Sequence, residues 1–344
     1  MTPEEELFRS MEATALPPEG NALDQRNVRR FFLTRRDVIL APFTFLAGLG
    51  AGYLLWQSRP AQSQQPAVVA PVVIAEPVSA VPTATPVTAP TPVRLPDSYA
   101  LPVVFGDIGP RLIAAGAIDL PRFLQVYQQA GQPLTSAQQA SLTEGSDAQI
   151  VITQENAYFL QNFFWAVGLT NQNAVLTEGS MAGNSAGRID RFASTGGWTL
   201  TTKPVTELYA SVPLVSLTPE QQTRLEETAS AVYRPCCDNP TTFPDCNHGM
   251  AMLGLLELMA AQDASADDLI EAAKFANAFW FPQQMHEVAT LLRVTEGIGY
   301  ADADARLIVS SNYASSSGFQ SIHRWLVDSG NLGQSDSDGN NCGV

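Results

Sequence analysis

The sequence predicts a mainly α-helical domain with a minor β-hairpin, joined to one N-terminal transmembrane helix. Three observations carry this prediction: a long uncharged apolar run near the N-terminus, a proline-rich segment after it, and a series of helix-start signals beyond residue 98. The chain has 344 residues, of which 45% are apolar and 15% charged, enough apolar material for a large core. We therefore expect one folded domain on one membrane anchor.

The N-terminal part of the chain predicts the direction of that anchor. Residues 1–37 form a polar tail that ends in a cluster of arginines with no acid among them, Arg26, Arg29, Arg30, Arg35 and Arg36. The run 38–56 has 19 residues and no charge; as a helix it would be about 28 Å long, close to the thickness of the hydrocarbon core. Basic clusters stay in the cytoplasm. We expect a plasma-membrane protein with a cytoplasmic N-terminus and an extracytoplasmic C-terminal domain.

The arginine pair before the apolar run resembles a twin-arginine export signal. Thr34 precedes Arg35 and Arg36, and the apolar residues Val38 and Ile39 follow, although that signal usually carries Phe-Leu and then lysine. The resemblance implies export of an already folded domain, loaded with any cofactor in the cytoplasm. The alternative is an ordinary signal anchor with two adjacent basic residues.

Residues 57–97 predict a stalk. They contain nine prolines, which favour polyproline II and give a maximum reach on the order of 120 Å. The best small-residue cleavage site, 68–70, is followed by Pro71, so we expect the anchor to be retained. The folded domain should span 98–328, and the Gly-, Ser- and Asp-rich residues 329–344 should form a flexible tail.

The formal charge of -15 narrows the choice of partners. Residues 97–344 hold 11 Lys and Arg against 26 Asp and Glu. Such a surface repels nucleic acid and anionic headgroups. We therefore expect no nucleic acid, and the excess of acids suits metal ions or a cationic partner.

Capping signals and apolar patterns predict the helices of the domain. A pair of helices should occupy 110–130, broken where Asp119 caps the second and Pro121 lies in its first turn. Thr218, Pro219 and Gln221 form the start of a helix that should run to about Val232. The other expected helices are an aromatic one at 158–165 and three near the C-terminus at 248–262, 266–281 and 283–294.

The β element is expected in the Gly- and Ser-rich stretch 177–203. There, Gly196 and Gly197 precede residues 198–202, which read as a turn into a short strand. We therefore expect a long surface loop that carries a hairpin.

One segment between two predicted helices has the residue types of a metal site. Within thirteen residues it holds Cys236, Cys237, Cys246 and His248. Thiolate and imidazole are ligands of zinc, and thiolates close to methionines such as Met250 suit copper(I). Cys246 or Asn247 should lie at the start of the helix near His248, where free N–H groups favour a thiolate. We expect these four residues to bind zinc or copper.

The order Pro235-Cys236-Cys237, with Cys246 and His248 further on, resembles a family of bacterial extracytoplasmic proteins named for a Pro-Cys-Tyr-Cys-Gly-Cys motif. The match is confined to this segment and lacks the alternating cysteines. The resemblance implies metal binding outside the cytoplasm.

The function expected from these patterns is a membrane-anchored metal-binding or carrier protein, with no catalytic motif that would require an enzyme. Two other interpretations stay open. In the first, Cys236 or Cys237 bridges Cys246 and the other reaches Cys342, giving a disulfide-stabilised module that meets a protein partner in the envelope. In the second, the chain is a thiol oxidoreductase with Cys246 as nucleophile and Cys236 or Cys237 resolving.

Overall fold

The structure is a computed structural model that describes residues 93–332. The predicted anchor at 38–56, the arginine pair Arg35 and Arg36, and Cys342 lie outside the described residues. In the described part of the chain, no helix is both long enough and apolar enough to cross a membrane.

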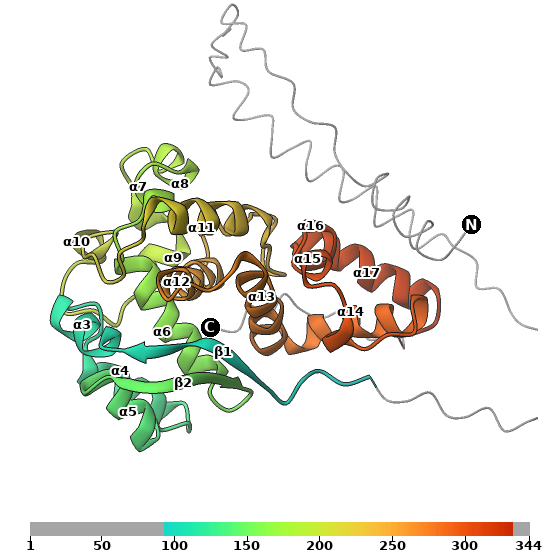
Figure 1. The fold of residues 1–344 in the computed structure, drawn as a ribbon, viewed down its shortest axis with the longest axis horizontal. Helices are drawn as coiled ribbons and strands as arrows, with labels where there is room; N and C mark the ends of the chain where they lie inside the picture. The colour runs from blue at the N-terminus through green and yellow to red at the C-terminus, as the bar shows by residue number, and fades with distance from the viewer. Residues whose placement is uncertain (1–92, 333–344) are drawn as a thin grey trace, which may run out of the picture. The chain divides into compact units, whose positions relative to one another are not determined.

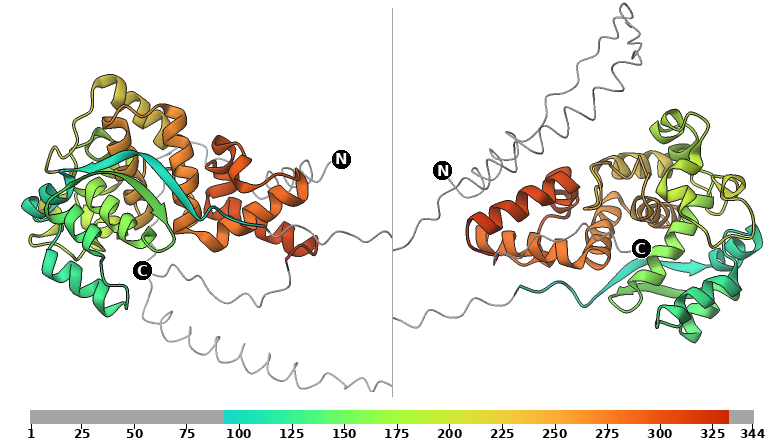
Figure 2. Two further views of the ribbon diagram at one scale, coloured as in Figure 1. Left: turned by 60° about the horizontal axis from the view of Figure 1, so that its bottom comes forward. Right: turned by 180° about the vertical axis from the view of Figure 1, so that it is seen from behind.

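The described residues are mainly helical, as predicted, with one small sheet (Figure 1). The elements in chain order are β1 Ser98–Gly106, α3 Ile108–Ala115, α4 Leu120–Gln129, α5 Ser136–Thr143, β2 Ser146–Thr153, α6 Ala157–Thr170, α7 Ala174–Thr177, α8 Ser180–Asn184, η1 Ile189–Arg191, α9 Ala193–Gly196, α10 Val205–Leu208, α11 Pro219–Ala231, α12 Asn247–Ala261, α13 Ala266–Trp280, α14 Pro282–Thr295, η2 Tyr300–Asp302, α15 Ala305–Ile308, α16 Ser311–Ala314 and α17 Ser316–Asp328. Helices α14 to α17 pack together at one end of the described domain (Figure 2).

The helix starts predicted from capping signals are confirmed. The Asp119 side chain accepts a hydrogen bond from the backbone N–H of Arg122 and caps α4. Thr218 and Gln221 form a reciprocal capping box at the start of α11. Helices α12, α13 and α14 agree with the three predicted near the C-terminus to within a residue or two. Local signals were sufficient here because a cap and the first turn of a helix lie within a few residues of each other.

The hairpin predicted in 177–203 is wrong. That stretch forms short helices and turns, and residues 198–202 contain no strand. The sheet instead pairs β1 with β2 in antiparallel orientation, and three helices separate these strands along the chain (Figure 2). Gly196 ends α9 against the backbone of Asp190, where a side chain would clash. Close packing therefore explains this glycine, which the sequence pattern assigned to a turn.

Amide side chains occupy both outer edges of the two-stranded sheet. On β1, Gln262 accepts from the N–H of Val104 and donates to its carbonyl, both at 3.0 Å. On β2, Asn156 accepts from the N–H of Thr153 and donates to the carbonyl of Val151, both at 2.8 Å. Each amide makes the pair of bonds that a neighbouring strand would make.

Helix α12 is the centre of the hydrophobic core, with buried residues all round it (Figure 1). It crosses α6 at two glycines. A Cβ on Gly254 would clash with the carbonyl of Phe164 and the backbone of Gly168, and a Cβ on Gly168 would clash with the carbonyl of Met250. The two backbones can approach this closely only because neither glycine has a side chain. The crossing fixes the position of α12 and therefore of its N-terminus.

One acid lies inside this core. Glu257, on α12, is fully buried, and its carboxylate oxygens have no hydrogen-bond partner of normal geometry among the described residues. Burial raises the pKa of Glu257 well above its ordinary value, and the nearby Asn171 amide opposes the shift only in part. Burial in the core therefore favours the protonated, neutral form of the Glu257 side chain.

Candidate metal centre

The segment between α11 and α12 is an ordered loop, residues 233–246, with the N-terminus of α12 at its end. The middle of the loop is fixed to the end of α11, because the backbone N–H and hydroxyl of Thr241 donate to the carbonyl of Val232 at 2.9 and 3.0 Å. On the other side, the backbone N–H of Ser316 donates to the carbonyl of Cys237 at 3.0 Å. The loop is therefore held by α11 and by the start of α17.

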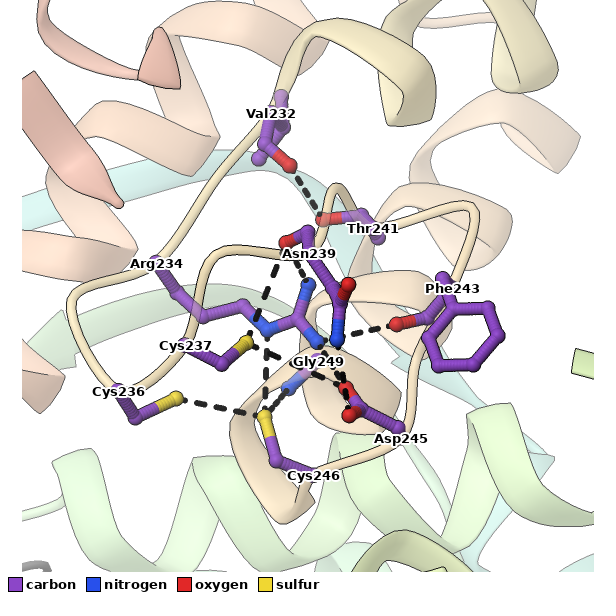
Figure 3. Close-up of polar contacts among 10 residues, drawn as sticks. All are labelled: Val232, Arg234, Cys236, Cys237, Asn239, Thr241, Phe243, Asp245, Cys246 and Gly249. Carbon is purple, nitrogen blue, oxygen red and sulfur yellow. Dashed lines mark hydrogen bonds and ion pairs between the residues drawn. The ribbon is translucent and has the colours of Figure 1, made fainter. Parts of the chain in front are cut away.

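The centre of the loop is the guanidinium of Arg234, whose side chain is 0% exposed (Figure 3). Its Nε–H donates to the Sγ of Cys246 at 3.2 Å, and Nη1 donates to the carbonyl of Asn239 at 2.6 Å. Nη2 donates to the carbonyl of Phe243 at 3.1 Å and to the carboxylate of Asp245 at 2.9 Å. Because these acceptors all belong to the loop, the loop is wrapped around one cation.

The absence of a side chain at Gly249 leaves room for the guanidinium of Arg234. A Cβ at this position would lie 2.5 Å from Nη2 and 2.6 Å from Cζ of Arg234. The same glycine donates its backbone N–H to the Sγ of Cys246 at 3.3 Å. A residue with a side chain at 249 would therefore push the guanidinium away from the cysteine that both groups contact.

The structure brings three of the predicted ligands together. The Sγ atoms of Cys236, Cys237 and Cys246 all lie within 4.8 Å of one another. Cys236 and Cys246 are the nearest pair, with their sulfurs 3.3 Å apart, and no disulfide joins any of the three. All three are partly exposed, so an ion could reach them from solvent. Such a set of thiols in one place is a candidate metal centre.

The three thiols and Arg234 form one electrostatic unit. The neighbouring thiols of Cys236 and Cys237, together with Arg234, hold the pKa of Cys246 well below its usual range. Hydrogen bonds with the other two cysteines, and burial, raise the pKa of Cys236. The Cys237 pKa is about 11: its hydrogen bond with Cys236 lowers it, but Cys246 and burial outweigh that effect. The negative charge of the group therefore lies on Cys246, next to the guanidinium.

Cys246 is also the N-cap of α12, one of the two residues that the sequence suggested for the helix start, and its sulfur accepts a hydrogen bond from the free N–H of Gly249. Burial by itself would lower the pKa of Arg234, but the charges of the cysteines, that of Cys246 foremost, raise it. Burial raises the pKa of Asp245, and Arg234 opposes the shift. The helix end and the guanidinium thus both stabilise a thiolate at Cys246.

The fourth predicted ligand, His248, lies on the first turn of α12 but does not belong to the 4.8 Å group. Its ring packs against Phe281, with centroids 4.3 Å apart, and lies 6.4 Å from the ring of Trp280. Burial lowers its pKa to about 4, and the charge of Cys246 opposes this shift. At neutral pH the imidazole is therefore uncharged and able to bind a metal without releasing a proton.

Met250, its neighbour Met252 and the other two histidines of the chain lie elsewhere. Met250 and Met252 are fully buried in the core. His286 is exposed on α14, and His323 on α17 contacts Glu287, with Nδ1 2.8 Å from the carboxylate. These residues add nothing to the three sulfurs.

The sequence analysis missed Arg234, Asp245 and Gly249. A signal was present: an arginine and an aspartate stand beside the cysteines of a proline-rich loop, and a glycine follows in the first turn of the next helix. Their meaning depends on the loop closing on itself, and spacing along the chain does not reveal such closure.

The fold and the site together define a mainly helical domain with a three-cysteine centre at the N-terminus of its central helix. The chain matches no protein-family model, and comparisons with curated proteins and with solved structures likewise give no match.

Proposed function

We propose that this protein binds a metal ion through Cys236, Cys237 and Cys246 and serves as a binding or carrier protein. The observation that carries the proposal is the group of three sulfurs within 4.8 Å of one another, with a buried guanidinium in contact. The function needs no catalytic step.

The spacing of the sulfurs suits a thiolate-bound ion. With Zn–S bonds of about 2.3 Å in a tetrahedral site, two ligand sulfurs lie about 3.8 Å apart. Cys236 and Cys246 stand at 3.3 Å, and the whole group lies within 4.8 Å. Rotations of the cysteine side chains, with the loop left in place, would adjust these separations.

Charge balance favours a divalent ion. Three thiolates and the Asp245 carboxylate carry four negative charges, and Arg234 supplies one positive charge inside the same loop. A divalent ion would leave less uncompensated negative charge in this partly buried place than a monovalent ion such as copper(I). We therefore expect zinc in preference to copper(I), and thiolates are good ligands for both.

His248 is proposed as the fourth ligand. Its neutral imidazole stands on the same helix turn that begins at Cys246, and its pKa responds to the charge on that cysteine. In a closed structural site the imidazole would complete four-coordination.

The cellular setting of the proposal comes from the sequence. The apolar run 38–56 and the basic residues before it support a single-pass anchor with the domain outside the cytoplasm. The pair Arg35 and Arg36 supports export after folding, so that the metal would be loaded in the cytoplasm. An acidic domain on a proline-rich stalk is suited to meet a protein partner in the envelope.

The test is elemental analysis of the full-length protein, purified in detergent with reductant and reconstituted with zinc. We expect stoichiometric zinc in the wild type and its loss in Cys246→Ser. The matched control is Cys342→Ser, which removes a thiol without changing the three sulfurs, and it should keep zinc. Wild-type protein that takes up no zinc and no copper(I), or Cys246→Ser protein that retains the metal, would overturn the proposal.

A further inference from the structure

The three sulfurs of the site are not equivalent. The Sγ of Cys236 points toward that of Cys246 across 3.3 Å, whereas the Sγ of Cys237 lies 4.0 Å from both the carbonyl of Asn239 and the carboxylate of Asp245 (Figure 3). A disulfide bond is about 2.05 Å long, so the first pair has to close by only about 1.2 Å. Cys236 is therefore the natural partner of Cys246.

We propose that the metal-free site is a dithiol centre that exchanges electrons with disulfides, with Cys246 attacking and Cys236 resolving. The inference rests on the proposed function in so far as it uses the same sulfurs, but it does not require that a metal be bound. It selects Cys236 over Cys237, which the sequence left open.

The surroundings of Cys246 suit an attacking sulfur. Its Sγ receives the N–H of Gly249 at the start of α12 and the Nε–H of Arg234. Both donors stabilise negative charge on this sulfur, whether it attacks a substrate or leaves when the exchange runs backwards. Cys236 receives neither of these bonds. The two sulfurs thus have different roles before any substrate arrives.

The chemistry is two successive exchanges. The Cys246 thiolate forms a bond to one sulfur of a substrate disulfide, the substrate S–S bond breaks, and one substrate thiolate leaves. Cys236 then attacks the Sγ of Cys246, its proton passes to a leaving thiolate, and the second substrate sulfur departs. The substrate disulfide gains two electrons and, with the proton of Cys236 and one proton from solvent, becomes two thiols, while the protein loses two electrons and gains a disulfide between Cys236 and Cys246.

This disulfide and the metal exclude each other. Closing the bond removes two of the three thiolates, and Cys237 with His248 supplies only two of the four ligands that a closed site needs. A bound ion in turn occupies the sulfurs that the exchange needs. The site is therefore expected to alternate between a metal-bound state and a disulfide state.

The test uses full-length protein in detergent, stripped of metal with a chelator, and oxidised glutathione as the probe. Mass spectrometry after alkylation should show one disulfide between the peptides that hold Cys236 and Cys246, with Cys237 alkylated. Cys237→Ser should form the disulfide at the wild-type rate. Cys236→Ser should stop with glutathione bound to Cys246. Protein reconstituted with zinc should react at least ten times more slowly than the stripped protein.

Two results would overturn the inference: a disulfide that forms as fast in Cys236→Ser as in Cys237→Ser, or glutathione found first on Cys237. Circular dichroism should confirm that both variants are folded. The two proposals fail separately. If the protein binds zinc but does not form this disulfide, only the exchange proposal is wrong. If the disulfide forms in a protein that takes up no zinc, only the metal-binding proposal is wrong. The variant Cys237→Ser should lose zinc and keep the exchange.

Discussion

Helix α12 makes two contacts of different kinds, one in its middle and one at its N-terminus. In its middle, α12 meets α6 through Gly254 and Gly168, where the absence of side chains lets two backbones touch. At its N-terminus, the loop 233–246 is built around one large buried side chain, Arg234. The helix crossing requires the absence of side chains, whereas the loop requires one particular side chain. At the crossing, the size of a replacement residue matters most. In the loop, a replacement for Arg234 would have to match both its size and its charge.

The largest effect should come from removing the cation. Arg234→Leu removes the cation that pairs with the Asp245 carboxylate and the donors to the carbonyls of Asn239 and Phe243. Breaking a buried pair in this way should lower the free energy of unfolding by about 3 to 5 kcal/mol, as measured by urea denaturation. Arg306→Leu is the control, because its ion pair with Asp267 is exposed. Equal losses in the two variants would mean that burial of Arg234 has no special weight.

A smaller loss should follow from filling the helix crossing. Gly254→Ala gains about 1 kcal/mol of helix propensity, but its methyl group would clash with the backbone of α6. Overpacking of this kind should give a net loss of about 2 to 3 kcal/mol in the free energy of unfolding. Gly183→Ala on α8 is the matched control, since a Cβ there meets no atom within 4 Å. Stability that is unchanged or higher in Gly254→Ala would contradict the close crossing.

The buried acid gives a prediction that depends on pH. Because the pKa of Glu257 is raised in the folded protein, the native state binds more protons than the unfolded state once the pH exceeds the ordinary value. Stability contributed by this group should therefore be present at acid pH and fall as the pH rises, by at most about 1.4 kcal/mol per pH unit. Glu257→Gln should remove this component. The difference is measured by urea denaturation of both proteins at a series of pH values from about 5 to about 8. Parallel pH profiles would show that the acid is not protonated in the core.

The smallest effect should come from the fourth proposed ligand. His248→Ala should weaken zinc binding by about tenfold, or about 1.4 kcal/mol, because the three thiolates remain and water can occupy the open position. A competition titration with a chromophoric chelator measures the change. The exposed His286→Ala is its control and should bind zinc as the wild type does. Unchanged affinity in both variants would remove His248 from the ligand set and leave the three sulfurs.

Most of the longer helices were predicted from the sequence because their signals are local, although α17 was not. The capping box of Thr218 and Gln221 defines a helix start within four residues. The strands β1 and β2 were missed because their pairing joins residues separated by three helices, a relation that no short window contains. Gly196 and Gly197 suggested a turn into a strand, but both in fact serve close packing.

The candidate site was likewise predicted only in part. The density of thiols in 236–246 was visible in the sequence, and so was the position of Cys246 at a helix start. The sequence did not show which of Cys236 and Cys237 faces Cys246, because adjacent residues point in different directions and only the closed loop decides between them. Arg234 went unnoticed because an arginine is normally a surface residue, and its burial here depends on acceptors that the folded loop supplies.

The amide groups of Gln262 and Asn156 have a consequence for behaviour at high concentration. A two-stranded sheet has two open edges, and open edges recruit strands from other molecules. Because these two side chains already hold the outward N–H and carbonyl groups of Val104, Val151 and Thr153, a second copy of the chain finds those positions taken. At these positions the sheet is therefore protected against edge-to-edge pairing with a strand of another copy.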